Sequence, residues 1–328
     1  MESNKMIMVI GSLNANPADR EMTRSDLRSV QLIGPDKQFL PIGYFQSWGE
    51  LGMSSMAVDP ANRMKLYFAT SSDIYLFDLE SGTQNNLHIN GLNDIHEISA
   101  IGENLWITNT KHDEIVSVNI QSNTVQRRVN LADYSCSASE SGEDPENTEW
   151  VDKFHVNLVF QGFDGDLYVL VHHTSGRQVV NRISKKLLKR QGNGGVVNID
   201  TNTRIPLNFK APHSVRHVNG EYWVFDSGHF ELKVFDKSWK LKESIDTKGF
   251  GRGGEYSPSS GMYYAGVSAT RKRYLGLFPG GDTVPNMIQV IDTSEYKIVD
   301  TVPVPGIEQI NNVYCIDQDV ADRLLQMA

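Results

Sequence analysis

A strand–turn–strand unit recurs along this sequence, and it restricts the fold more than any other feature. Each unit contains a short apolar strand, a tight turn, an aromatic-rich strand, a polar loop and a third strand that ends in Asp or Asn. The aromatic-rich strands read LYFAT, LWITN, LYVLV, YWVFD and MYYAG. Gly and Asn in the turns, with β-branched or aromatic residues in the runs, are typical of β-hairpins. The sequence therefore predicts an all-β protein.

The number and spacing of the units predict a β-propeller, in which each blade is a small antiparallel sheet. Five units follow one another at intervals of roughly 40 to 60 residues. A sixth blade is supplied by strands at both ends, KMIMVIGSLN and RSVQLIGPDKQF near the start and INNVYCID at 310–317. A blade built from both termini closes the ring and leaves no free edge. We expect a six-bladed propeller, although seven blades would also fit.

We expect one domain over residues 1–328, interrupted by two loop insertions. The stretch at about 134–150 (YSCSASESGEDPENTEW from 134) is acidic and turn-rich, and the stretch at about 174–195 contains the basic run SKKLLKRQGNGG. Long loops in a compact fold are often functional.

Composition and charge exclude several classes of protein. The 328 residues carry 31 Lys and Arg against 40 Asp and Glu, a formal net charge of −9, which argues against a nucleic-acid binder. Two cysteines allow at most one disulfide, so a disulfide framework is excluded. No apolar run approaches the length of a membrane span, and the first residues contain too short an apolar run for a secretory signal. We expect a cytoplasmic protein with no membrane partner.

Seven of the nine histidines fall at two recurrent positions of the units. His96, His155 and His213 each stand at the start of a first strand. The other four follow 16 to 18 residues later, after the second strand: His112, His172, His173 and His229. In a propeller, the loop after the second strand returns to the face on which the first strand starts. We therefore expect the seven side chains on one rim of the central channel.

This pattern predicts a functional site at the channel mouth. Three imidazoles with an open position suit Zn²⁺, Fe²⁺ or Mn²⁺, so we expect the three first-strand histidines to be metal ligands. The four later histidines are the candidate catalytic groups, and imidazoles can act as acids and bases without a metal. In the structural alternative, histidine recurs in each unit because the imidazole ring forms a hydrogen bond with the neighbouring blade.

Other polar residues fall on the same predicted rim. Asn157 points the same way as His155 because side chains alternate along a strand. Arg252 takes the place of the histidine in the fifth unit, and Arg271 lies in the loop after its second strand. A guanidinium binds carboxylate or phosphate through paired hydrogen bonds, so we expect these three residues to bind an anionic ligand. The alternative for the arginines is a solvated loop paired with nearby acids.

Several segments resemble a bacterial β-propeller family that is a domain of unknown function: NDIHEISAIGENLWITNT, FHVNLV, GGVVNIDTNT, PHSVRHVNGEYWVFDSGHFEL and GFGRGGEY with YYAGVSATRKR. The resemblance covers roughly residues 91–275 and implies the propeller fold. It implies that His96, His155, His213, Ser268 and Arg271 are family features, which adds Ser268 to the ligand-binding candidates. It implies no reaction.

The plan also resembles, more loosely, gluconolactonase-type and streptogramin-lyase-type propellers, which hold a divalent cation at the channel mouth. Those propellers use mainly carboxylate and amide ligands or one histidine, and the histidine-rich mouth departs from them.

The leading hypothesis is an enzyme that acts on a small anionic substrate, by metal-assisted or histidine acid–base chemistry. Lyase, isomerase, hydrolase and oxygenase reactions all stay open. The rival hypothesis is a non-catalytic propeller that binds a peptide, a glycan or a partner protein on the same face.

Overall fold

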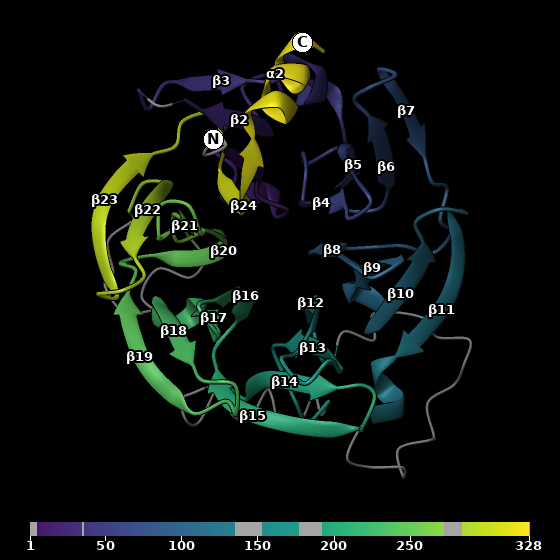
Figure 1. Cartoon of the computed structure of the whole chain (residues 1–328), viewed down its shortest axis with the longest axis vertical. Helices are drawn as coiled ribbons and strands as arrows, with labels where there is room; N and C mark the ends of the chain where they lie inside the picture. The colour runs from purple at the N-terminus through teal and green to yellow at the C-terminus, as the bar shows by residue number, and fades with distance from the viewer. Residues whose placement is uncertain (1–4, 35, 135–152, 177–191, 272–283, 328) are drawn as a thin grey trace. The chain divides into compact units, whose positions relative to one another are not determined.

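Six four-stranded antiparallel sheets form a six-bladed β-propeller, which confirms the predicted fold (Figure 1). The structure is a computed structural model that describes residues 5–34, 36–134, 153–176, 192–271 and 284–327. Most of both predicted insertions, 134–150 and 174–195, lies outside the described residues. The chain packs as two compact units. Unit 1 comprises residues 1–88 and 213–328, and unit 2 comprises residues 89–212.

Unit 1 holds four blades. The first blade has the strand order β24 (Gln309–Asp317), β1 (Lys5–Ser12), β2 (Val30–Ile33) and β3 (Phe39–Pro41). The second has β4 (Ser55–Asp59), β5 (Asn62–Ala69), β6 (Ile74–Asp78) and β7 (Thr83–Asn86). The third has β16 (Pro212–Val218), β17 (Glu221–Asp226), β18 (Glu231–Phe235) and β19 (Leu241–Asp246). The fourth has β20 (Phe250–Ser257), β21 (Met262–Ser268), β22 (Met287–Asp292) and β23 (Lys297–Pro303).

Unit 2 holds the other two blades. One has β8 (Ile98–Ile101), β9 (Asn104–Asn109), β10 (Glu114–Asn119) and β11 (Thr124–Asn130). The other has β12 (Val156–Gln161), β13 (Leu167–Val171), β14 (Gly194–Asn198) and β15 (Thr203–Phe209).

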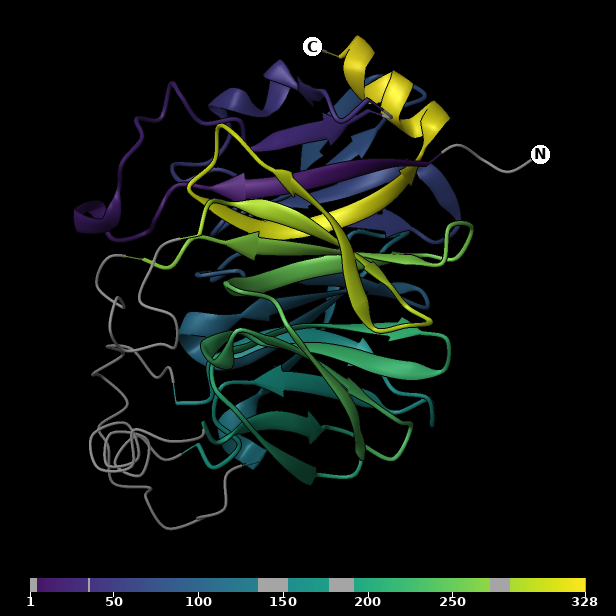
Figure 2. The same ribbon diagram turned by 90° about the vertical axis from the view of Figure 1, so that its left-hand side faces the viewer.

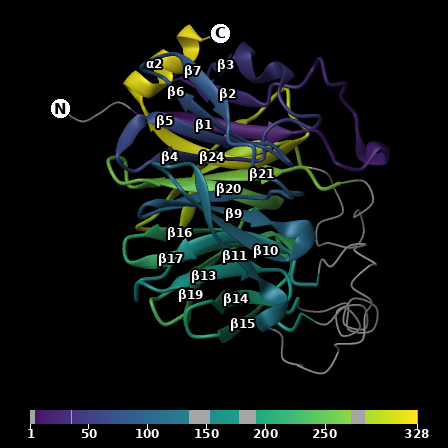
Figure 3. The same ribbon diagram turned by 90° about the vertical axis from the view of Figure 1, so that its right-hand side faces the viewer.

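The two chain ends meet in one blade, as predicted. Strand β1 pairs antiparallel with β24, with Met8 opposite Tyr314, and the two strands lie side by side (Figure 3). Both side chains join the apolar core of unit 1 that also contains Phe68. The C-terminal helix α2 (Gln318–Gln326) follows β24 (Figure 2). Its Leu324 is buried in the same core. This pairing covers two strand edges that would otherwise stay exposed.

In five of the six blades, an Asp or Asn at the end of the third strand, or directly after it, shapes the turn that follows. Asp78 Oδ1 accepts hydrogen bonds from the backbone N–H groups of Glu80 and Ser81, at 3.0 and 3.1 Å. The same turn recurs at Asn119, Asn198, Asp236 and Asp292. A short acceptor side chain that binds the backbone two residues on favours a turn over a continuing strand. The repeated residue therefore specifies the hairpin to the fourth strand.

Apolar residues of the second strands contribute to the cores of both units. Trp106 on β9 is buried with Phe154 and Val169 in unit 2, and Trp223 on β17 is buried with Phe225 in unit 1. Within the described residues, no helix is both long and apolar enough to cross a membrane.

Candidate functional site

Three imidazole rings of unit 2 lie in contact. His96 precedes β8, His155 precedes β12 and His172 follows β13. The ring of His155 contacts both of the others, with centroids 4.9 Å from His96 and 4.1 Å from His172. The repeat therefore brings together two predicted metal ligands and one predicted catalytic residue.

Hydrogen bonds of the backbone fix two of these rings relative to each other. The N–H of His172 donates to the carbonyl of His155 at 3.2 Å, and the N–H of His173 donates to the carbonyl of Phe154 at 3.1 Å. These bonds continue the β12–β13 ladder toward the site. The β12–β13 hairpin therefore positions the rings of His155 and His172, which are tilted by 36° to each other.

A buried carboxylate that the sequence did not single out holds His155 in place. Asp113 is fully buried, and Oδ1 accepts hydrogen bonds from the backbone N–H groups of Phe154 and His155 at 2.9 and 3.0 Å. Its Oδ2 accepts a third bond from the N–H of Lys153, at 2.5 Å. Hydrogen bonds to a charged acceptor are stronger than neutral ones. The start of β12 is therefore clamped to the neighbouring blade of the same unit.

His155 adopts a left-handed backbone conformation, with φ at 54°. For a residue with a Cβ this region is uncommon, and such residues cluster at functional sites when the surroundings hold them there. The Asp113 clamp supplies that support. The conformation is a physical reason to regard His155 as the centre of the site.

The hydrogen bonds of His96 determine which ring nitrogen carries the proton. Thr110 Oγ1 donates to the carbonyl of Val156 at 2.6 Å, so it can only accept from His96 Nδ1, which lies 3.1 Å away. The carbonyl of Asp94, also 3.1 Å from Nδ1, is a second acceptor. Nδ1 is therefore protonated, and Nε2 holds the lone pair of the neutral ring.

The other two unit 2 histidines differ in environment. His173 places Nδ1 2.5 Å from Oδ1 of Asn193, and its ring centroid lies 6.3 Å from that of His172. His112 is exposed at the end of the 3₁₀ turn η3 (Thr110–His112), and the structure gives it no ring contact among the described residues. The predicted set therefore separates into partly buried rings and one surface ring.

Asn157 is placed in the interior of unit 2. Its side chain is 2% exposed, and Nδ2 donates to the carbonyl of Pro212 at 2.5 Å. Its Oδ1 is buried without a hydrogen-bond partner among the described residues. Most buried polar atoms are paired, so an unpaired amide oxygen two residues from His155 is consistent with a ligand-binding role.

In unit 1, His213 repeats the arrangement of His96. Its ring is 8% exposed, and Nδ1 lies 3.0 Å from Oγ of Ser227, which donates to the carbonyl of Gly251. His213 is therefore also protonated on Nδ1. Through the hydroxyl of Ser227, His213 on β16 is connected to Gly251 on β20, the first strand of the next blade. His213 and Ser227 therefore also have a structural role.

His229 contacts a buried acid at the end of β17. Its Nδ1 lies 2.7 Å from Oδ2 of Asp226, and Lys233 Nζ lies 2.6 Å from the same oxygen and 3.2 Å from Glu231. Burial alone would lower the pKa of Lys233, but the two carboxylates outweigh it and raise that pKa above its usual value.

The two predicted arginine anchors contact amide side chains of β24. Arg252 Nη1 donates to Asn311 Oδ1 at 3.0 Å, and its guanidinium lies 5.7 Å from the centroid of Phe250. Arg271 Nη2 donates to Gln309 Oε1 at 2.6 Å. Both guanidinium groups are held in one orientation, which suits recognition of an anion.

Ser268 has both of its hydrogen-bonding roles occupied within unit 1. Its side chain is 2% exposed, Oγ donates to the carbonyl of Ile310 at 3.1 Å and accepts from the N–H of Ile310 at 2.9 Å. The hydroxyl joins β21 to β24. This contact gives Ser268 a structural role that the sequence did not indicate.

The side chains of unit 2 supply suitable donors for a metal. Imidazole nitrogens and an amide oxygen suit Zn²⁺, Fe²⁺ or Mn²⁺. Among the described His, Cys, Asp and Glu residues, however, the group whose three ligand atoms lie within 4.8 Å of one another is Asp226, His229 and Glu231 of unit 1. There the ammonium of Lys233 already contacts both carboxylates.

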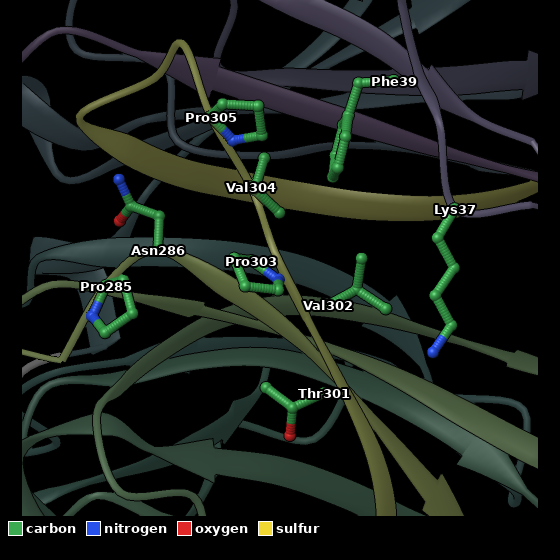
Figure 4. A pocket seen from close by; sticks show the side chains of 9 residues that line it. All are labelled: Lys37, Phe39, Pro285, Asn286, Thr301, Val302, Pro303, Val304 and Pro305. Carbon is green, nitrogen blue, oxygen red and sulfur yellow. The ribbon is translucent and has the colours of Figure 1, made fainter.

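A groove on unit 1 has none of the predicted site residues in its lining. It has a volume of about 450 Å³ and is lined largely by apolar side chains, including Phe39, Val302 and Val304 (Figure 4). Lys37, which also lines it, forms an ion pair of 2.6 Å with Asp300.

Solved structures with this fold are distant in sequence. A protein of unknown function from Bacteroides caccae is 14% identical with a TM-score of 0.57, covering 96% of this chain and 99% of that chain. A chain of the nidogen/laminin complex is 10% identical with a TM-score of 0.56, covering 95% and 98%. A Bacteroides fragilis protein, provisionally named a 6-phosphogluconolactonase, is 12% identical with a TM-score of 0.50, covering 95% and 98%. These likenesses show the fold alone.

No curated protein matches the sequence. The family described as a domain of unknown function (DUF4915) matches residues 152–322, a range that includes His155, His172, His213 and His229. Because this match spans more than half of the 328 residues, the chain belongs to that family.

Proposed function

We propose that this protein is an enzyme that transfers protons to and from a small anionic substrate at His96, His155 and His172. The observation that carries the proposal is the ring of His155, which contacts two other imidazoles from a left-handed backbone that Asp113 holds. Strain of this kind persists where the surrounding structure supports it.

The chemistry follows from the properties of imidazole. Histidine gains and loses a proton near neutral pH, so it can act as general acid or general base. His96 offers Nε2 as the accepting atom because Nδ1 is held by Asp94 and Thr110. Neighbouring rings can share a proton, and a protonated ring among them attracts an anion. A carbanion- or enolate-forming step, as in a lyase or an isomerase, would use these properties directly.

The arginines remain candidates for anion binding within unit 1, where Arg252 and Arg271 are each fixed by an amide oxygen. In an alternative form of the proposal, the same site binds a metal. His96 and His155 would be its first ligands in unit 2, and the metal would supply a Lewis acid.

The test uses His155→Asn, because asparagine tolerates the left-handed backbone while it removes the ring. Wild type and variant are incubated with a panel of small carboxylates and phosphate monoesters, and NMR follows turnover. We expect at least one compound to be converted by wild type and not by the variant. His88→Asn is the matched control, since His88 is also left-handed and lies outside the predicted set.

Two results would oppose the proposal. Turnover that survives in His155→Asn would move the chemistry to another residue. Binding of a peptide or glycan without turnover in either protein would favour the non-catalytic propeller. Elemental analysis of both proteins, purified without a histidine tag or a chelator, decides whether a metal belongs to the site.

A further inference from the structure

Unit 1 carries a separate imidazole that has the orientation of a general base. Asp226 is fully buried at the end of β17, and His229 stands at the end of the 3₁₀ turn η6 (Ser227–His229) with 28% of its side chain exposed. The Nδ1–Oδ2 distance is 2.7 Å. An ionised carboxylate only accepts hydrogen bonds, so Nδ1 carries the proton and Nε2 holds the lone pair.

A buried carboxylate that accepts from Nδ1 performs two tasks in acid–base catalysis. It fixes the tautomer and the orientation of the ring, and it stabilises the imidazolium that forms when Nε2 takes a proton. With 28% of its side chain exposed, His229 is accessible to a small molecule in solvent. The geometry of this pair therefore meets the first requirement for a base.

The neighbouring charges determine what kind of substrate this base suits. Glu231 supplies a second carboxylate, and Lys233 contacts both acids, at 2.6 Å from Asp226 and 3.2 Å from Glu231. Two carboxylates and one ammonium leave the group with a net negative charge while the imidazole is neutral. A negative surrounding repels anions and accommodates neutral or cationic molecules. The Lys233 ammonium also occupies the place between the carboxylates that a metal cation would need.

A matching turn in unit 2 shows whether the fold itself requires the pair of Asp226 and His229. Asn109, His112 and Glu114 stand at the same spacing around η3 as Asp226, His229 and Glu231 do around η6. Asn109 Nδ2 donates to the carbonyl of Gly91 and to Glu114 Oε2, at 2.9 and 2.8 Å. The same turn therefore forms with an amide in place of the acid, so the fold does not require the Asp226 carboxylate.

We propose that Asp226 and His229 form a second reactive centre, in which His229 Nε2 takes a proton from the O–H or N–H of a neutral or cationic substrate. Nδ1–H stays hydrogen-bonded to Asp226 throughout. The proton on Nε2 then returns to the product or passes to water, which restores the neutral ring. This centre is independent of the proton transfer proposed for unit 2.

Diethyl pyrocarbonate tests the proposal without a known substrate. The lone pair of Nε2 attacks one carbonyl carbon and the bond from that carbon to the central oxygen breaks. Ethyl carbonate leaves and, with the Nδ1 proton, yields ethanol and CO₂. The tryptic peptide of residues 217–233, which extends to Lys237 in a variant without Lys233, carries His217 and His229, and fragment ions separate the two. The peptide of residues 112–127 carries His112 as the control within the same digest.

Two variants should change the reactivity of His229 in opposite directions. Asp226→Asn removes the charge that favours attack by Nε2, and we expect the rate above pH 7 to fall about fivefold. Lys233→Met removes the ammonium that competes with His229 for Asp226, and we expect a faster reaction at His229. The rate at His112 should stay the same in both.

A merely structural pair would respond differently. Equal rates at His229 in wild type and in both variants, or the same direction of change in both, would overturn the proposal. Thermal denaturation checks that each variant is folded. If Asp226→Asn fails to fold, the test depends on Lys233→Met alone. A faster modification of His229 in that variant then supports the proposal, and an equal or slower one overturns it.

Discussion

Asp113 Oδ1 accepts a hydrogen bond from the backbone N–H of His155 at 3.0 Å, although the two residues belong to different blades of unit 2. The same carboxylate accepts from Lys153 and Phe154. One buried acid therefore supports the strained residue at the centre of the proposed site.

Replacing Asp113 by Asn should lower the free energy of unfolding by about 2 kcal/mol, because a charged acceptor of three N–H groups becomes a neutral one that bonds at most two. The amide NH₂ would face a backbone N–H and add repulsion. Urea denaturation measures the effect. Asp133→Asn, an exposed neighbour, should change stability by less than about 0.5 kcal/mol. Equal losses in the two variants would count against the clamp.

The left-handed backbone of His155 predicts an unusual order of tolerated residues. His155→Asn should be close to wild type in stability, since Asn adopts this region readily. His155→Val should be less stable than the Asn variant by about 1–2 kcal/mol, because a left-handed conformation is costly for a side chain with a branched Cβ. Denaturation of the pair checks this order. A Val variant as stable as the Asn variant would show that the backbone at 155 relaxes freely.

The hydroxyl of Thr110 should control the tautomer of His96. In Thr110→Val the carbonyl of Val156 loses its donor and Nδ1 of His96 loses an acceptor, and we expect a destabilisation of about 1–3 kcal/mol. Thr110→Ser keeps the hydroxyl and should retain most of the stability. Nitrogen-15 NMR of the histidine rings should show protonated Nδ1 at His96 in wild type and in the Ser variant. An Nε2-protonated ring in wild type would contradict the assignment.

Much of the fold follows from the sequence because its signals are local and repeated. The aromatic second strands, the tight turns and the Asp or Asn after each third strand lie within a single blade, so each unit can be recognised alone. The blade built from both termini could also be predicted, since INNVYCID has the apolar pattern of a first strand and a closed propeller needs a partner for it.

The site could be predicted only where it repeats. His96 and His155 occupy the same place in successive blades, and their rings are in contact. His112 and His172 differ by one residue in their distance from the first-strand histidine, and a shift of one residue moves a side chain to another face. His172 consequently lies against His155, whereas His112 is exposed.

Residues that act across blades carried no local signal. Asp113 contacts a segment some 40 residues away, and in the sequence TKHDE it looks like an ordinary turn residue. Thr110, Ser227 and Ser268 likewise bind backbone groups of the next blade. Such pairings depend on how blades pack, which a single sequence does not display.

The thiol of Cys315 should make stability depend on pH in the alkaline range. Burial, with a smaller contribution from the carboxylate of Glu255, raises the pKa of Cys315 from 9.0 to about 12, against a small opposing effect of Lys5. The protonated thiol is thus favoured in the folded chain, so its contribution is complete below pH 9 and is lost as the pH rises from 9 to 12. Wild type should lose about 2 kcal/mol relative to Cys315→Ala between pH 8 and pH 11.

Urea denaturation of both proteins at several pH values measures this difference. Tyr67, whose pKa burial also raises to about 12, is present in both proteins and cancels from the comparison. The folded thiol should also react slowly with a disulfide reagent at pH 8 and quickly after unfolding, because the thiolate is the reactive form. A stability difference that stays constant from pH 8 to pH 11, together with rapid labelling of folded Cys315, would mean that the thiol is reached by solvent and ionises normally.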